Sequence, residues 1–216
     1  LARRSKLLEH YGIEIVFDIG ANIGQYAVQL RQRGYQGKIV SFEPLSQAFS
    51  QLQQAARRQP PWEVVNLALS DSEGEAEIHV SANSMSSSFL PMLPDHLEVM
   101  PEARYVGTER VRISTLEQVV DRFARPGQRR YAKIDAQGCD RRVIEGAGPS
   151  LKRFCLIQME VSLKPLYEKE DTLAEMLVYM RDKGYQLVSL EPGFSDPRNG
   201  HLLQVDCIFL DSSLAP

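Results

Sequence analysis

The chain has 216 residues, 43% of them hydrophobic, and a formal net charge of −3. This length fits one α/β domain, and no window approaches the roughly 18 unbroken apolar residues of a membrane span. The slight negative charge argues against a general binder of nucleic-acid backbones. The basic start has no long apolar run behind it, so no signal peptide is expected. The three cysteines lack C-x-x-C spacing, which favours a reducing, cytoplasmic setting over a disulfide framework or a zinc site.

The first 70 residues alternate between apolar runs and helical patterns. Strands are predicted at 14–20, 37–44 and 62–70. Helices are predicted at 22–34 and 46–59, the first ended by a glycine and the second by a pair of prolines. This βαβαβ order predicts a parallel sheet with right-handed crossovers.

The pattern changes in the middle of the chain. Residues 75–81 alternate between apolar and polar, as in a half-exposed edge strand. Residues 82–110 are rich in Ser, Pro and Met without clean periodicity, and so long an irregular stretch is usually a lid or binding loop. A lid-like insertion on the substrate side is therefore predicted there. After a strand at 111–114, a helix is predicted to open with a capping box from Ser114 to Glu117.

The last third returns to the α/β alternation. Strands are predicted at 131–138 and 154–162, with a short helix between them. An amphipathic helix at 172–184 is predicted to be capped by Asp171. Strands at 185–192 and 202–210 follow, and their short Gly- and Pro-containing connection suits antiparallel pairing. The prediction is one α/β domain over residues 1–216, a Rossmann-like sheet with a reversed edge, without internal repeat or second domain.

The turn at "VFDIGANIGQ" (16–25) is the strongest local motif. A dinucleotide-binding turn needs G-x-G-x-x-G, whose second glycine lets the backbone approach a pyrophosphate. Asn22 stands at that position, where a side chain obstructs a pyrophosphate but can hydrogen-bond an amino-acid moiety. The alternative is that Gly20 and Gly24 only permit a tight turn and close helix packing.

Two acidic residues favour a specific ligand for this turn. Asp18 lies just ahead of it, and a carboxylate suits an ammonium or sulfonium group better than a phosphate. Glu43 ends the second predicted strand, where it could accept hydrogen bonds from both hydroxyls of a ribose. A ribose, a cationic centre and an amino acid together describe S-adenosylmethionine.

Several blocks resemble the FkbM family of S-adenosylmethionine-dependent methyltransferases. They are "VFDIGANIGQYAVQLRQRGYQGKIVSFEPLSQAF", "ALSDSEGEAEIHV", "SMSSSFLPM", "KIDAQGCDRRVIEGAG" and "LEPGFSD...LLQVDCIFL", in the family's order over about residues 12–210. The resemblance implies a class I methyltransferase fold, with seven strands in the order 3-2-1-4-5-7-6 and the last strand antiparallel. It also implies methyl transfer to a hydroxyl of a sugar or secondary metabolite.

One position departs from the family pattern. After the D-x-Q-G loop the family commonly has an aromatic or small residue and then Glu, whereas this chain has Cys139 and Asp140. The carboxylate is kept but is one methylene shorter, which puts in doubt any role that needs the reach of Glu at 140.

The resemblance implies a set of cofactor-binding residues. Those at the first turn would line the methionine end: Asp18, Gly20, Asn22, Gly24 and Gln25. Glu43 would hold the ribose, with Pro44 beside the adenine. The end of the third strand would flank the adenine ring: Ala68, Leu69, Ser70 and Asp71. Asp71 has an alternative role as a simple turn residue.

Two carboxylates are the candidate catalytic residues. Asp135 ends the fourth predicted strand and Glu160 ends the fifth, so both would point into the cleft and could take the proton of a hydroxyl acceptor. Alternatively, Asp135 only contacts the cofactor or braces Lys133, and Glu160 caps the loop that follows it. Two carboxylates could also hold a divalent cation. A metal is not favoured, since nothing else requires one and the histidines are not paired at ligand spacing.

The irregular stretch holds the candidate acceptor-binding residues. Ser86, Ser87 and Ser88 can hydrogen-bond a sugar, and Phe89 can cover it. A flexible serine-rich loop is the alternative. His201 precedes the last strand and is the histidine to consider as a base, although it also fits a surface loop. The expected partner is a small-molecule acceptor, and a homodimer is left open. The competing functions are an NAD(P)-dependent oxidoreductase and a non-catalytic cofactor-binding module of the same fold.

Overall fold

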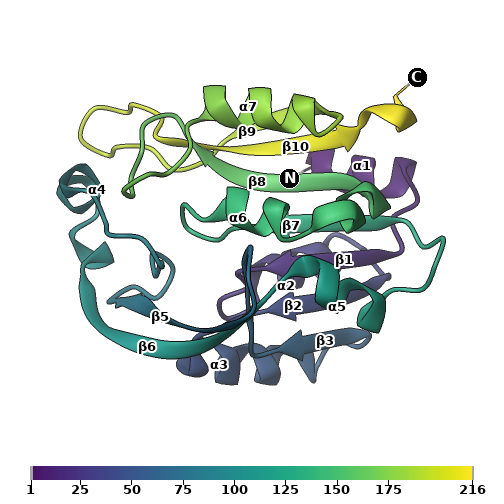
Figure 1. Ribbon diagram of the computed structural model, residues 1–216, viewed down its shortest axis with the longest axis horizontal. Helices are drawn as coiled ribbons and strands as arrows, with labels where there is room; N and C mark the ends of the chain where they lie inside the picture. Colours follow the sequence, from purple (N-terminus) through teal and green to yellow (C-terminus); the bar gives the residue numbers. More distant parts are fainter. Residues whose placement is uncertain (1, 216) are drawn as a thin grey trace.

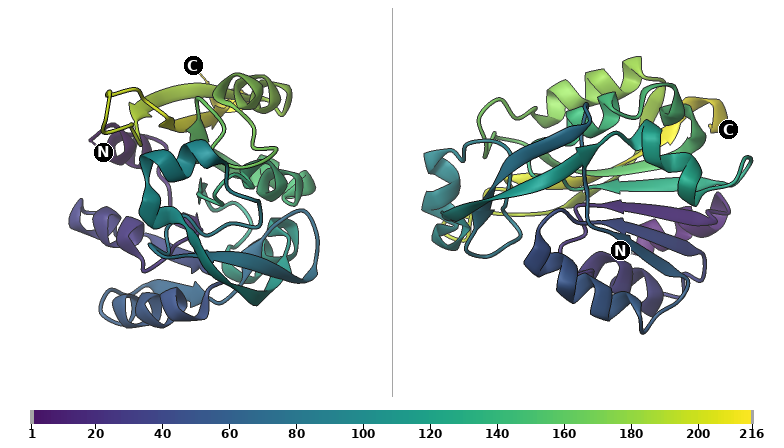
Figure 2. Two further views of the ribbon diagram at one scale, coloured as in Figure 1. Left: turned by 90° about the vertical axis from the view of Figure 1, so that its left-hand side faces the viewer. Right: turned by 60° about the horizontal axis from the view of Figure 1, so that its bottom comes forward.

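The computed structural model describes residues 2–215, which form three layers (Figures 1 and 2). The central layer is a seven-stranded sheet made of β1 (Ile15–Ile19), β2 (Lys38–Phe42), β3 (Trp62–Val65), β7 (Arg130–Ile134), β8 (Phe154–Ser162), β9 (Tyr185–Pro192) and β10 (Gln204–Asp211). One face carries α1 (Ala2–His10), α2 (Gln25–Gln32) and α3 (Ser46–Ala56). The other face carries α5 (Leu116–Phe123), α6 (Asp140–Glu145) and α7 (Leu173–Asp182).

The strand order confirms the predicted topology. The sheet runs β3-β2-β1-β7-β8-β10-β9, which is 3-2-1-4-5-7-6 when its own strands are counted along the chain. The five strands from β3 to β8 are parallel, and β10 runs antiparallel to both β8 and β9. Every residue of β1 and β7 is buried, as the apolar runs require for strands covered on both faces.

The third predicted strand, 62–70, is wrong as a single element. It divides into β3 in the main sheet and β4 (Ala68–Leu69) in a second, three-stranded sheet of order β4-β6-β5. Asn66 lies between the two pieces, and its side-chain amide donates to the carbonyl oxygens of Glu43 (3.0 Å) and Pro44 (2.8 Å). These bonds hold the chain as it leaves the edge of the main sheet.

The second sheet carries the predicted insertion. Its strand β5 (Gly74–Ser81) pairs antiparallel with β6 (Tyr105–Ser114), so residues 105–110 form a strand and are not irregular as predicted. Half-exposed strands with few apolar residues show no clear period, which explains the error. The connection between them contains α4 (Pro94–Val99) and a 3₁₀ turn (Pro101–Ala103). Its two ends meet, because the Ala82 amide donates to the Arg104 carbonyl at 3.0 Å.

Both predicted helix caps are wrong by one residue. Ser114 is the last residue of β6, paired with Leu69, and Thr115 caps α5 by accepting from the Gln118 amide at 3.3 Å. Thr172, not Asp171, caps α7 and forms a capping box with Glu175. In each case the preceding residue has another partner, which for Asp171 is the guanidinium of Arg141.

Two further short 3₁₀ turns, at Gly148–Arg153 and Ser212–Leu214, complete the described elements. Among residues 2–215, no helix combines the length and the apolar composition that crossing a membrane would demand.

Candidate functional site

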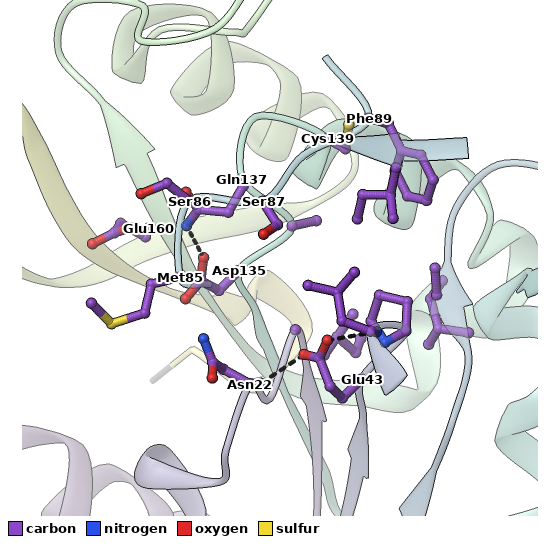
Figure 3. Close-up of a pocket in the computed structure, with 18 of the residues that line it drawn as sticks. Asn22, Glu43, Met85, Ser86, Ser87, Phe89, Asp135, Gln137, Cys139 and Glu160 are labelled. Atoms are coloured by element: carbon purple, nitrogen blue, oxygen red, sulfur yellow. Dashed lines mark hydrogen bonds between the residues drawn. The ribbon is translucent and has the colours of Figure 1, made fainter. Parts of the chain in front are cut away.

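A cavity of about 260 Å³ lies where β1, β2, β7 and β8 end, beneath the segment that joins β5 to β6 (Figure 3). This is the edge of an open α/β sheet at which ligands generally bind. The predicted site residues that line it are Gly20, Asn22, Gln25, Glu43, Pro44, Ala68, Leu69, Ser86, Ser87, Phe89, Asp135 and Glu160. Residues far apart in the chain thus meet around one space.

Gly20 sets how closely the first turn approaches the end of β7. Its φ of +73° is in the left-handed region, and a Cβ added there would lie 2.0 Å from the carbonyl oxygen of Asp135. The Asp135 amide also donates to the Ile19 carbonyl at 3.0 Å. Only glycine therefore allows the turn and the Asp135 backbone to pack together.

Glu43 joins the end of β2 to the same turn. One carboxylate oxygen accepts from the Asn22 amide at 2.8 Å and the other from the Leu45 amide at 2.9 Å (Figure 3). Each oxygen keeps a further lone pair that can face the cavity. The side chain is 5% exposed, and this burial raises the pKa of Glu43 to about 7 although the two amide hydrogen bonds and Lys133 act in the opposite direction.

The wall beside Glu43 is apolar. It is formed by Pro44, Leu45, Leu67, Ala68, Leu69 and Ile78. Ser70 and Asp71 lie outside the cavity: the Ser70 hydroxyl donates to the Asp71 carboxylate at 3.1 Å, and Asp71 is exposed. A cavity with a buried carboxylate beside an apolar wall suits a nucleoside, whose ribose is polar and whose base is apolar on its faces.

Asp18 lies behind the cavity and does not line it. It is fully buried, accepts from the Ser41 hydroxyl at 2.9 Å and lies 3.5 Å from the ammonium group of Lys133. Burial raises the pKa of Asp18, and the charge of Lys133 opposes that rise. Its position favours a role in holding Lys133 over direct contact with a ligand.

Lys133 connects the first turn to Asp135. Its ammonium group donates to the Gly20 carbonyl at 3.0 Å and to the Asp135 carboxylate at 3.3 Å. Burial alone would lower the pKa of Lys133, but the charges of Asp135 and Asp18 raise it overall. Lys133 is therefore a fixed positive charge, and the alternative that Asp135 braces it agrees with this geometry.

The other oxygen of Asp135 faces the loop after β7. It accepts from the side-chain amide of Gln137 at 2.6 Å (Figure 3). The Gln137 amide oxygen accepts in turn from the Tyr167 hydroxyl at 2.7 Å. The Tyr167 hydroxyl lies 3.1 Å from the carbonyl oxygen of Ser86. Asp135 is thus positioned from both sides, while 29% of its side chain stays exposed towards the cavity.

Glu160 is the other carboxylate of the cavity, and it accepts no hydrogen bond from residues 2–215. It lies directly opposite Asp206 in the antiparallel pair of β8 and β10. Burial raises the pKa of Glu160, and the charges of Asp135 and Asp206 raise it further. A carboxylate whose pKa is raised towards neutrality, without a partner, is suited to accept a proton.

The segment between β5 and β6 forms the opposite side of the cavity. Ser86, Ser87 and Phe89 line it, together with Met85. Ser88 points elsewhere, because its hydroxyl donates to the Gln137 carbonyl at 2.6 Å and accepts from the Leu90 amide. Ser88 therefore fastens the segment to the loop after β7.

Two more predicted residues do not reach the cavity. Gly24 caps α2 with a φ of +92°, and a Cβ there would lie 2.7 Å from the Trp62 ring, so it serves helix packing. This agrees with the packing alternative for that glycine. His201 is exposed in the loop before β10, where its amide donates to the Asn199 side chain.

Some lining residues were not predicted from the sequence. They are Ile19, Leu45, Leu67, Ile78, Met85, His96, Met100, Ala136, Gln137 and Gln204. Cys139 and Phe194 also line the cavity. His96 is 3% exposed and packs edge-on against the Tyr167 ring with centroids 5.3 Å apart. Burial lowers the pKa of His96. Gln137 could have been predicted, because it belongs to the D-x-Q-G loop. His96 could not, because the sequence of α4 contains no recognisable motif.

The departure at Asp140 has a local explanation. Asp140 is the first residue of α6 and accepts from the Ala136 amide at 3.4 Å, so it closes its own loop and does not line the main cavity. Burial and the nearby charge of Asp135 raise the pKa of Asp140 to about 7. Over the described part of the chain, no group of three or more His, Cys, Asp or Glu side chains is arranged to hold a metal ion.

Comparisons with known proteins bear on this site. A family model described as the methyltransferase FkbM domain matches residues 18–187. A comparison with curated protein sequences gave no match.

Solved structures with a similar fold include three methyltransferases. A methyltransferase FkbM from Methylobacillus flagellatus KT has 14% identity and a TM-score of 0.54, over 90% of this chain and 43% of that one. An rRNA methylase from Streptococcus thermophilus has 10% identity and a TM-score of 0.52, over 97% and 95%. Magnesium protoporphyrin IX methyltransferase from Synechocystis PCC 6803, solved with bound SAM, has 9% identity and a TM-score of 0.52, over 98% and 77%. This chain spans less than half of the Methylobacillus chain, and at these identities the likeness concerns the fold.

Proposed function

The chain belongs to the methyltransferase FkbM family, and from this premise we propose that it transfers a methyl group from S-adenosylmethionine to a hydroxyl of a sugar or secondary metabolite. The observation that carries the proposal is the buried Glu43, held by the first turn beside an apolar wall. This arrangement fits a ribose next to a planar base. The absence of a glycine at position 22 disfavours a pyrophosphate there.

We assign the two sides of the cavity to two ligands. The cofactor side consists of Gly20, Asn22 and Gln25 with residues 43–45 and 67–69. On it, Glu43 accepts hydrogen bonds from ribose hydroxyls and the apolar wall covers the adenine. The acceptor side consists of residues 85–100, 135–139, 160 and 194–204 that line the same cavity, with the segment 82–104 between β5 and β6 as its lid.

S-adenosylmethionine supplies a methyl group on a sulfonium sulfur, which keeps the bonding electron pair when the acceptor oxygen bonds to the methyl carbon. The protein must orient the acceptor hydroxyl and remove its proton. Glu160 is the base that we favour, since it has no partner and its pKa is raised. Asp135 orients the hydroxyl, because its own oxygens are already held by Lys133 and Gln137.

The lining of the acceptor side supports a small polar acceptor. Hydroxyls of Ser86 and Ser87 and amides of Gln137 and Gln204 offer both donors and acceptors, while Phe89, Phe194 and Met100 exclude water. No lysine or arginine lines the main cavity among the residues that the structure describes. A nucleic-acid acceptor is therefore not proposed, because it would need cations for its phosphates. Three unpaired cysteines keep the cytoplasm as the expected compartment.

The first test is a calorimetric titration of the protein with S-adenosylhomocysteine and, separately, with NAD. We expect micromolar binding of S-adenosylhomocysteine and none of NAD. Glu43→Gln should lose at least about tenfold in affinity, since an amide group cannot accept all the hydrogen bonds that the carboxylate accepts. Glu63→Gln is the matched control, because Glu63 is an exposed glutamate on the neighbouring strand β3.

Transfer is tested with isotope-labelled S-adenosylmethionine and a panel of sugars and hydroxylated natural products. Label in a product ether confirms an O-methyltransferase. Binding of S-adenosylhomocysteine without transfer to any acceptor would favour the non-catalytic module. Heat from NAD with none from S-adenosylhomocysteine would favour the oxidoreductase.

A further inference from the structure

A second cavity, of about 210 Å³, lies beside the first on the face of the main sheet that α1 and α2 cover. Gln25, Asp135 and Glu160 line both cavities, so the two spaces meet at these residues. The other lining residues of the second cavity are Arg4, Ala21, Tyr26, Gln29, Lys133, Ile134, Gln158 and Asp206. The first cavity thus continues towards α1.

Arg4 brings a guanidinium group to this cavity, and two of its three nitrogen atoms lack a hydrogen-bond acceptor. The residue is 6% exposed, and its Nε and Nη2 atoms are buried without any hydrogen bond. Its guanidinium carbon lies 4.5 Å from the centroid of the Tyr26 ring, so a cation–π contact holds the group beside α2. Buried donors without acceptors are costly, so the position favours a ligand that supplies acceptor oxygens.

Several other polar groups around the cavity already have partners. The Tyr26 hydroxyl donates to the amide oxygen of Gln158 at 3.0 Å, and the Gln158 amide nitrogen donates to Asp206 at 2.9 Å. Lys133 is occupied by Gly20, Asp135 and Asp18. Of the cations that line this cavity within residues 2–215, Arg4 is therefore the one with donors to spare.

The charges around the cavity are separated. Arg4 supplies a positive group from α1, while Asp206 supplies a carboxylate from β10 that lines this cavity and not the first. A ligand group that carries both a carboxylate and an ammonium finds an opposite charge for each. An amino acid has this pattern, and the planar fork of an arginine suits a carboxylate in particular.

We propose that Arg4 binds the carboxylate of the methionine moiety of the cofactor in this second cavity. The inference rests on the proposed function, since it takes S-adenosylmethionine as the ligand. It extends the cofactor site past Gln25 and makes α1 part of that site. The same chemistry could come from an acidic acceptor, and the test separates the two sources.

The experiment compares two nucleosides by calorimetry. S-adenosylhomocysteine carries the amino-acid end, and 5′-methylthioadenosine lacks it. Arg4→Gln should weaken S-adenosylhomocysteine by about 10- to 100-fold, the range for hydrogen bonds to charged groups, and leave 5′-methylthioadenosine within about twofold. Arg4→Lys should recover part of the loss. Arg3→Gln on the same helix is the control and should change neither affinity, because Arg3 does not line the cavity.

A purely structural role of Arg4 would lower both affinities together. That result, or an unchanged ratio of the two affinities, would overturn the inference and leave an acidic acceptor as the source of the carboxylate. If the wild-type protein does not bind S-adenosylhomocysteine, the proposed function fails first. A change of ligand tests the same contact without any variant: the methyl ester of S-adenosylhomocysteine should bind wild type about 10- to 100-fold more weakly than the free carboxylate, and equal affinity contradicts the inference.

Discussion

The cofactor side and the acceptor side of the cavity differ in the sequence separation of the residues that hydrogen-bond within each side. On the cofactor side, Glu43 is held by amides two and 21 residues away. On the acceptor side, Tyr167 reaches Ser86 over 81 residues, and Ser88 reaches Gln137 over 49. The first side is built within the first 69 residues, whereas the second exists only once the whole chain has folded. Changes on the two sides should therefore have different consequences.

The largest effect is expected from Gly20→Ala, which tests whether the two sides share a rigid boundary. The new Cβ would lie 2.0 Å from the Asp135 carbonyl oxygen, so the turn and the end of β7 must separate. We expect loss of S-adenosylhomocysteine binding and a clearly lower free energy of unfolding in denaturant titrations. Gly34→Ala is the control, since Gly34 also has a positive φ but open space around it; it should cost only about 1–2 kcal/mol for the left-handed backbone. Equal losses would argue against the rigid boundary.

Glu160→Gln should separate catalysis from cofactor binding. Removing a general base typically lowers the rate by about 10²–10⁴-fold. We expect kcat to fall within this range while the affinity for S-adenosylhomocysteine changes little. Asp206→Asn is the comparison, because Asp206 is the register partner of Glu160 but lines only the second cavity. If Asp206→Asn lowered kcat more than Glu160→Gln, the assigned base would be wrong.

The affinity for S-adenosylhomocysteine should depend on pH because of a group on the cofactor side. The pKa of Glu43 is raised to about 7 in the free protein, and ribose hydroxyls that donate to the carboxylate would lower it in the complex. Binding should therefore release a proton near pH 6, and the affinity should be about tenfold weaker at pH 6 than at pH 8. Calorimetry in buffers of different ionisation enthalpy measures the proton release. Glu43→Gln should abolish the part of the pH dependence that Glu43 causes.

The carboxyl group of Glu43 also makes the free energy of unfolding depend on pH. Ligand affinity should rise with pH, whereas this contribution to stability should fall. Because the pKa of Glu43 is higher in the folded chain than the ordinary value of 4.5, its contribution is most favourable below pH 4.5. That contribution is lost as the pH rises to about 7 and is constant above it. The difference in free energy of unfolding between Glu43→Gln and wild type should therefore shift in favour of the variant between these two pH values.

The smallest effect is expected from Tyr167→Phe, which removes one hydroxyl from the acceptor side. That hydroxyl contacts Ser86 and Gln137, so its loss should raise the KM for the acceptor a few-fold and leave the affinity for S-adenosylhomocysteine unchanged. Tyr185→Phe is matched, since its hydroxyl is also buried and bonded to two carbonyl groups, those of Leu151 and Phe154, but far from the cavity. Both variants should lose about 0.5–1.5 kcal/mol of stability. A KM that rises equally in both would show that the effect is not local.

The same contrast explains what the sequence could predict. The strand order and the places of Asn22 and Glu43 follow from apolar periods, turn residues and the family resemblance, all of which are local signals. Asp18 and Gly24 lie in the right motif but face the interior, because a motif does not specify which side a residue faces. The role of each site residue remains a prediction.

Long-range contacts were not predictable from local patterns. The division of strand 62–70 depends on Asn66 bonding back to Glu43 and Pro44. The contribution of His96 depends on α4 packing against Tyr167, and no period or motif in 94–99 indicates it. A binding role for Arg4 could not be predicted, because it depends on the burial of its donors in a cavity beside α1 and α2.

The hydrogen bond between Ala82 and Arg104 has a practical consequence for redesign. The segment leaves the β5–β6 hairpin at Ala82 and rejoins it at Arg104, and between them Ser88 pairs with His79 of β5 and donates to the Gln137 carbonyl. A cassette of residues 83–103 that keeps Ser88 should therefore leave the register of β5 and β6 unchanged. The cores on the two faces of the main sheet draw almost nothing from this cassette. Libraries of variants confined to residues 83–103 would thus change which acceptor binds while leaving Asp135 and Glu160 unchanged.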